Sequence, residues 1–187
     1  MRKVLFLGVS VLVLAAASVG WSAAGGGGGG PRQDRLAGGG TFGPGCSDGT
    51  APFCPANARE FSIDAAANPE GDGAYGTFVY GVPALGSTLV IGRITCLHVE
   101  GDSAVAGGYV TGGTAAATAQ VFFVYMRDRG DAGSFTRDRS SAAFVDVATS
   151  ADVPAGFPNE CPPLDNNAFK SGYLDLAAGD VQITDAK

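Results

Sequence analysis

Apolar side chains recur at every second position along much of this chain, and this period constrains the fold more than any other sequence feature. Within Glu60–Ala65, the side chains of Phe61, Ile63 and Ala65 share one face and polar side chains share the other, the pattern of a half-buried strand. Residues 118–127, TAQVFFVYMR, are apolar on both faces, which indicates a strand covered on both sides. Since no segment shows the period of a helix of normal length, the sequence predicts an all-β fold.

The most informative segment is ITCLHVEGDSAVAGGYV, residues 94–110. Two extended runs flank Gly101-Asp102, a two-residue turn that suits a hairpin with positive φ. Alternation places Leu97 and Val99 in the core. The side chains predicted to point to the outer face are those of Ile94, Cys96 and His98.

Glycine-rich turns and glycine-interrupted strands favour a closed sheet over two packed sheets. Glycine inside a strand often marks a bulge or a bend at a barrel corner, as expected for the glycines in residues 35–42 and for Gly92 in residues 87–99. A turn is also expected at 178–180. The predicted strands are residues 35–42, 60–65, 74–80, 87–99, 104–110, 118–127, 141–147 and parts of 171–184. We therefore expect an antiparallel β-barrel of about eight strands, with a β-sandwich as the alternative.

The N-terminal segment predicts export. Arg2 and Lys3 precede an almost unbroken apolar run, Val4–Val19, and small residues follow it, as in a secretory signal peptide cleaved after Ala24. The alternative is an uncleaved membrane anchor, because the apolar segment is nearly long enough to span a bilayer. We expect residues 1–24 to be the signal peptide, 25–34 a glycine-rich flexible linker and 35–187 a secreted, extracellular β-domain.

Charge narrows the class of partner. After loss of Arg2 and Lys3, ten basic residues remain against 18 acidic ones, a net charge of −8. Such a surface repels phosphate backbones and anionic lipids, so neither nucleic acid nor membrane insertion after cleavage is expected. The partner stays unknown, with a cell-surface or small-molecule ligand as the expectation.

Four cysteines, Cys46, Cys54, Cys96 and Cys161, indicate two disulfides in an exported chain. We favour Cys46–Cys54 as a local staple and Cys96–Cys161 as a bond across the outside of the sheet. On the loop-entropy model the long link contributes about 4 kcal/mol and the short one about 2–3 kcal/mol. Zinc is not expected as a cofactor, because the spacings lack a close cysteine pair and the chain has a single histidine.

The sequence contains no recognisable catalytic set. Any serine, histidine and aspartate triad would need His98, which lies mid-strand on the predicted outer face, and no serine occupies a G-x-S-x-G turn.

Asp128, Asp131 and Asp138 are candidate calcium ligands, but their spacing matches no known calcium loop. Neighbouring arginines compete for these carboxylates, so we interpret the loop as a salt-bridged, solvated hairpin tip. Aromatic side chains that could line a barrel cavity for an apolar ligand are Phe78, Tyr80, Phe122, Phe123 and Tyr125.

Five segments follow one another in a recognisable order: GGGTF, EFSIDAAA, ITCLHVEGDSAVAGG, VFFVYMRDRGDAG and GDVQIT. They resemble a group of small secreted bacterial all-β domains of unknown function, whose central hairpin carries the pattern C-x-x-V-x-G-[ND]-x-A. The resemblance covers most of Arg35–Lys187 and brings no catalytic residues with it. The loop that holds Cys46 and Cys54 is an addition to the pattern.

The functional expectation is a secreted, disulfide-stabilised β-domain with a non-enzymatic role, in extracellular binding or as a structural component. One alternative is a small barrel that binds an apolar small molecule, like some isomerases or cyclases. The other is a calcium-dependent adhesion module built on Asp128, Asp131 and Asp138.

Overall fold

The structure, a computed structural model, describes residues 32–42, 58–83, 86–117, 119–130, 138–145, 153–165 and 174–187; for residues 142–145 it describes the backbone only. Across these residues the chain is all-β, as the period of two predicts, and the only helical element described is one short 3-10 helix, η2 (Thr114–Ala117). The strands are β1 (Asp34–Phe42), β2 (Arg59–Ala67), β3 (Tyr75–Val82), β4 (Ser87–Glu100), β5 (Ser103–Gly112), β6 (Val121–Arg127), β7 (Arg139–Val145), β8 (Leu174–Asp175) and β9 (Ala178–Thr184).

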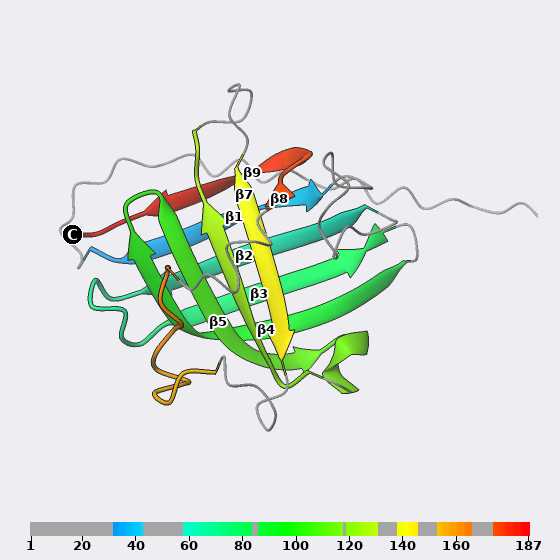
Figure 1. Cartoon of the computed structure of the whole chain (residues 1–187), viewed down its shortest axis with the longest axis horizontal. Coiled ribbons are helices and arrows are strands. Elements are labelled where there is room, and N and C mark those ends of the chain that lie inside the picture. The colour runs from blue at the N-terminus through cyan, green and yellow to red at the C-terminus, as the bar shows by residue number, and fades with distance from the viewer. Residues whose placement is uncertain are drawn as a thin grey trace, which may run out of the picture.

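The strands form one sheet in the order β8-β7-β6-β5-β4-β3-β2-β1-β9, with antiparallel neighbours throughout. Strands adjacent in the chain from β1 to β8 are also adjacent in the sheet, so the topology is a meander. The sheet curls into a half-barrel (Figure 1). The described part thus has nine strands where about eight were expected, in a single curled sheet and not in two packed sheets.

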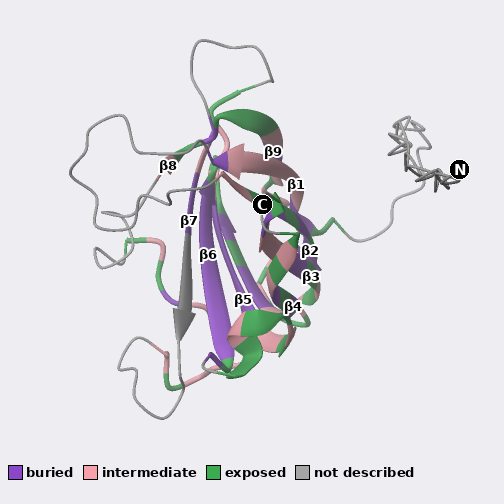
Figure 2. Cartoon of the chain, turned by 90° about the vertical axis from the view of Figure 1, so that its right-hand side faces the viewer, coloured by how far each residue is buried: buried purple, intermediate pink, exposed green. Residues whose placement is uncertain are grey.

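The concave face of the curl is packed with side chains. Phe122 on β6 and Phe78 on β3 are both buried, and their rings stack with centroids 5.1 Å apart. Gly92 on β4 makes room for this pair, because a Cβ there would lie 2.2 Å from the Phe122 ring. Leu36 and Val181, from the far end of the sheet, belong to the same buried cluster. In Figure 2, the buried residues (purple) run along nearly the whole of β6, in the middle of the curl.

The central hairpin is confirmed, with one correction. Gly101 adopts a φ of 59° in the turn between β4 and β5, and Leu97 and Val99 are buried in the concave cluster. Ile94, however, is buried in that same cluster and does not share the outer face with Cys96. The cause is a bulge: the register shifts between Ile94 and Cys96, so Thr95 is the extra residue and the alternation inverts there.

The C-terminal segment links the two ends of the sheet. β8 pairs with β7 and β9 pairs with β1, yet only Leu176 and Ala177 separate β8 from β9 in the chain. The predicted turn at 178–180 is therefore wrong, since these residues already belong to β9. Gly179 faces Gly40 of β1, and a Cβ at Gly179 would lie 2.2 Å from the carbonyl oxygen of Gly39. Close backbone approach and a φ of 110°, and not a turn, favour glycine at this position.

Carboxylates occupy the seam between β9 and the start of β7. Asp138 is buried; its Oδ1 accepts a hydrogen bond from the Arg129 N–H and its Oδ2 accepts one from the Val181 N–H, both at 2.8 Å. Asp128 uses its Oδ2 to accept the Ile183 N–H at 3.3 Å. The outward N–H groups of β9 thus bond to aspartates in place of a neighbouring strand, which satisfies donors that would otherwise be orphaned at a sheet edge.

Candidate binding groove

A segment with little regular structure, residues 153–165 (the strap), lies against the convex face of the sheet. Beneath it β6 buries Val121, Phe123 and Tyr125, so this strand is covered on both sides as its sequence predicts. Phe157 anchors the strap: its ring meets those of Tyr109 and Phe123 edge-on, with centroids 5.2 and 5.6 Å away. Such edge-to-face pairs add about 0.5–1.5 kcal/mol each beyond the area they bury.

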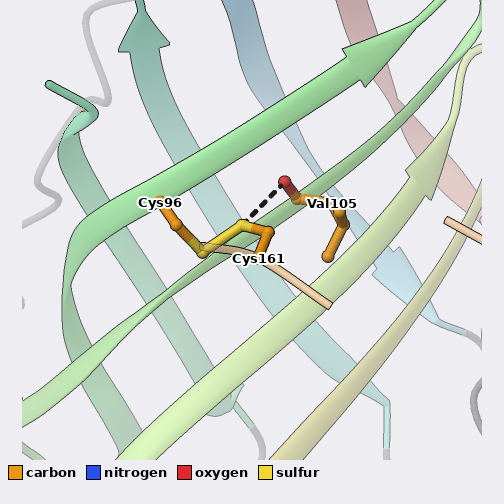
Figure 3. The surroundings of a disulfide bond; sticks show 3 residues. All are labelled: Cys96, Val105 and Cys161. Carbon is orange, nitrogen blue, oxygen red and sulfur yellow. Dashed lines mark hydrogen bonds between the residues drawn. A yellow bond between two sulfur atoms is a disulfide. The ribbon is translucent and has the colours of Figure 1, made fainter. Parts of the chain in front are cut away.

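A disulfide holds the strap to the sheet. Cys96 on β4 and Cys161 in the strap are bonded, with Cα atoms 5.4 Å apart, which confirms the predicted link across the outside of the sheet (Figure 3). Cys161 Sγ also lies 3.5 Å from the Val105 carbonyl oxygen on β5. Gly107 faces Cys96 in the ladder, and a Cβ there would lie 2.4 Å from the Phe123 ring and 2.9 Å from the Cys96 sulfur. Glycine at this position therefore leaves room for both the aromatic ring and the disulfide.

An open groove of about 850 Å³ lies beside the strap, at the end of the sheet that carries the Gly101–Asp102 turn. One cross-strand row forms its floor: Glu100 of β4, Ser103 of β5, Arg127 of β6 and Arg139 of β7 are consecutive partners in the ladder. His98 joins this floor one step further along β4. The strap supplies the facing wall, through Pro163, Leu164 and Asp165.

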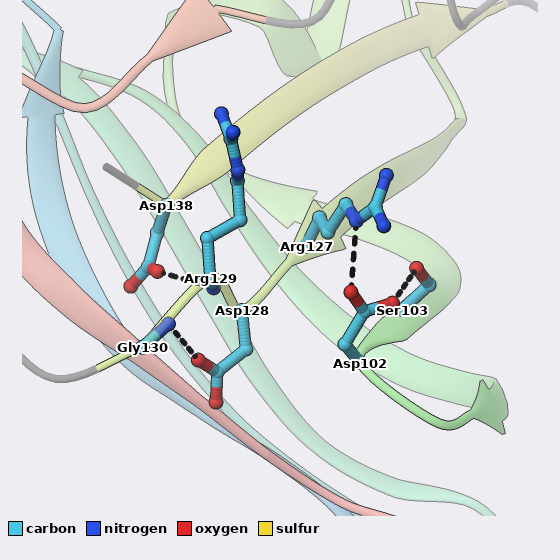
Figure 4. A network of polar contacts seen from close by, with 7 residues as sticks. All are labelled: Asp102, Ser103, Arg127, Asp128, Arg129, Gly130 and Asp138. Atoms are coloured by element: carbon cyan, nitrogen blue, oxygen red, sulfur yellow. Dashed lines mark hydrogen bonds and ion pairs between the residues drawn. The ribbon is translucent and has the colours of Figure 1, made fainter. Parts of the chain in front are cut away.

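Ion pairs fix the two arginines of the floor. Arg127 Nε donates to Asp102 Oδ2 at 2.9 Å, and Ser103 Oγ donates to Asp102 Oδ1 at 2.8 Å (Figure 4). Arg139 Nε lies 2.8 Å from Asp175 Oδ1 of β8. Slight burial of Asp102 opposes its ionisation, but the bonds from Ser103 and Arg127 outweigh it, so the pKa of this carboxyl lies below its ordinary value.

The candidate calcium ligands do not form a solvated cluster. Asp138 is buried and Asp128 is half-buried, and each of their four oxygens accepts one backbone N–H. Two of these bonds, from Arg129 to Asp138 and from Gly130 to Asp128 Oδ1 at 2.9 Å, are drawn in Figure 4. The interpretation as a solvated tip is therefore wrong for Asp138. Asp131 lies outside the described residues. In the described part of the chain, no three histidine, cysteine or acidic side chains gather as a metal site.

Other predicted residues separate in the fold. His98 is exposed on the outer face, as expected. The five aromatic side chains do not line one cavity, since Phe78, Tyr80 and Phe122 pack in the concave cluster, whereas Phe123 and Tyr125 lie under the strap. The signal peptide and the Cys46–Cys54 link fall outside the described residues.

The groove itself was missed by the sequence analysis. The arginines expected to compete for the loop carboxylates include Arg127 and Arg139, but these two pair with acids outside the loop, Asp102 and Asp175. The antiparallel register would have indicated the arginine pair: if β6 and β7 form a hairpin around that loop, Arg127 and Arg139 face each other directly.

Comparison with protein-family models, with curated proteins and with solved structures finds no match to this chain. Among the described residues, no helix has the length and apolar character needed to cross a membrane.

Proposed function

We propose that this protein is a secreted, disulfide-stabilised binding domain without enzymatic activity, and that its extracellular ligand occupies the groove beside the strap. One observation carries the proposal: the wall of the groove is a segment of little regular structure that a covalent bond, Cys96–Cys161, fixes over the sheet. A pre-formed wall reduces the entropy lost when a ligand binds. Disulfides also persist mainly in oxidising, extracellular compartments.

The convex groove is a better candidate than the inside of the curl. On the concave face, Phe78, Phe122 and Leu36 are at most 1% exposed and belong to one buried cluster. Because side chains fill this face, it is a poor candidate for binding an apolar small molecule. The groove, in contrast, presents exposed His98, Glu100 and Arg127 at its floor. Convergent polar groups in a concave surface are typical of a ligand site.

Binding through the groove is tested with a variant that fills it. Fluorescently labelled protein is incubated with washed cells of the organism that produces it and with fractions of the growth medium of these cells. We expect the wild type to be retained on the cells or on a medium fraction, and His98→Trp, whose indole would occupy the groove, to lose this retention. Thr88→Trp, at an exposed position of the same strand outside the groove, should keep it. Equal retention of all three proteins would contradict a role of the groove and favour a structural component.

A further inference from the structure

Two arginines occupy directly opposed positions on neighbouring strands at the floor of the groove. Arg127 of β6 and Arg139 of β7 are ladder partners, and like charges placed opposite each other destabilise a sheet. Flanking acids offset this repulsion, since Asp102 is hydrogen-bonded to Arg127 and Asp175 forms an ion pair with Arg139. The sheet thus holds two guanidinium groups side by side in a concave surface.

The ion pairs orient the two guanidinium groups, and both side chains stay partly exposed. Both acids approach the Nε atom of their arginine, at 2.9 and 2.8 Å. The side chains of Arg127 and Arg139 nevertheless remain 55% and 41% exposed. For Arg127, the bond to Asp102 leaves the edge formed by the two terminal nitrogens, which can donate two parallel hydrogen bonds to a carboxylate or a phosphate.

We propose that the groove binds an anionic oxygen group, a carboxylate or a phosphate, between Arg127 and Arg139; this inference rests on the proposed function. The surrounding acids limit the size of the anion. Glu100 and Asp165 also line the groove, and acidic residues exceed basic ones in the chain, 18 to 12. A polyanion would be repelled by this field, whereas a compact group that fits between the two arginines is not. The ligand is therefore a small acid or the acidic group of a neutral molecule.

The test is a titration of the ¹⁵N-labelled secreted protein, followed by two-dimensional NMR. Acetate and inorganic phosphate are the probes, with sodium chloride at equal ionic strength as the reference and glucose as a neutral probe. We expect one of the anions, at millimolar concentration, to shift the amide signals of Ser103, Arg127 and Arg139 beyond the chloride reference. The stronger anion identifies the source of the oxygen group.

Variants separate a built site from general charge effects. Arg127→Gln should weaken binding of the anion about tenfold or more, because it removes charge-assisted hydrogen bonds. Arg127→Lys keeps the charge but loses the planar fork, so it should weaken binding as well. Arg35→Gln is the matched control: Arg35 also pairs with an acid, Asp64, at 3.3 Å, but does not line the groove, and its loss should leave the affinity unchanged.

Three results would overturn the inference. The first is that neither anion shifts the groove signals beyond chloride. The second is an equal loss of affinity in Arg127→Gln and Arg35→Gln, which would indicate only nonspecific attraction. The third is a shift of the groove signals by glucose alone, which would leave the groove as a ligand site and refute its preference for an anion. The proposal that the groove binds a ligand at all is tested separately: it fails if His98→Trp is retained on cells as well as the wild type.

Discussion

Replacing Cys96 and Cys161 together by alanine is expected to lower the free energy of unfolding by about 4 kcal/mol. The bond joins residues 65 positions apart, so its removal restores a large part of the conformational entropy of the unfolded chain. In a chain of this size such a loss corresponds to a fall in Tm of about 10 °C. Calorimetry and urea unfolding under non-reducing conditions measure both quantities.

Removal of the disulfide should destabilise the strap more than the rest of the domain. Without the bond, the strap is held to the sheet mainly by the packing of Phe157 and Leu164 on the cluster that contains Phe123. We expect amide hydrogen exchange to accelerate in residues 153–165 more than on the concave side, for example at Leu97. A loss of stability below about 1 kcal/mol, or uniform acceleration, would contradict the role of the bond as the fixing point of the strap.

The second large effect concerns the seam. Asp138→Ala is expected to cost about 3 kcal/mol, because it leaves the buried N–H of Val181 and the N–H of Arg129 without an acceptor. Asp138→Asn retains one acceptor oxygen and should cost about half as much. Urea unfolding gives the free energies, and hydrogen exchange at Val181 reports the bond itself.

Asp64→Ala is the matched control for the seam. Asp64 also bonds to another residue, Arg35, but its side chain is 63% exposed. Removing an exposed ion pair changes stability by less than about 1 kcal/mol. If Asp138→Ala and Asp64→Ala had the same small effect, the carboxylates would not be what secures β9 to the rest of the sheet.

The sequence predicts the strands well because each has a strong local signal. The alternation in β2 and the two apolar faces of β6 locate these strands without knowledge of their partners. Alternation also places Cys96 on the face opposite Leu97, and its bond to Cys161 was expected because the other two cysteines, Cys46 and Cys54, lie close together in the sequence. Alternation fails at Ile94, because a bulge at Thr95 shifts the register there and nothing in the local pattern marks it.

The seam and the groove depend on pairing between distant segments, and this is why local patterns miss them. Gly179-Asp180 has the composition of a turn, yet it lies in β9 opposite the glycines of β1. Likewise, Asp138 is only one of several charged residues in its loop, and its role depends on β9, which brings the Val181 N–H to it. The pairing of Arg127 with Arg139 becomes visible only once the β6–β7 register is known.

The most direct test of the central claim, that a covalently fixed strap shapes the outer face of a secreted domain, is a non-reducing peptide map by mass spectrometry. The protein is expressed with its own N-terminal segment and recovered from the medium. We expect a peptide pair that links Cys96 to Cys161, on a chain that begins at Gly25. Free thiols at both positions, or a bond from Cys96 to Cys46 or Cys54, would contradict the account.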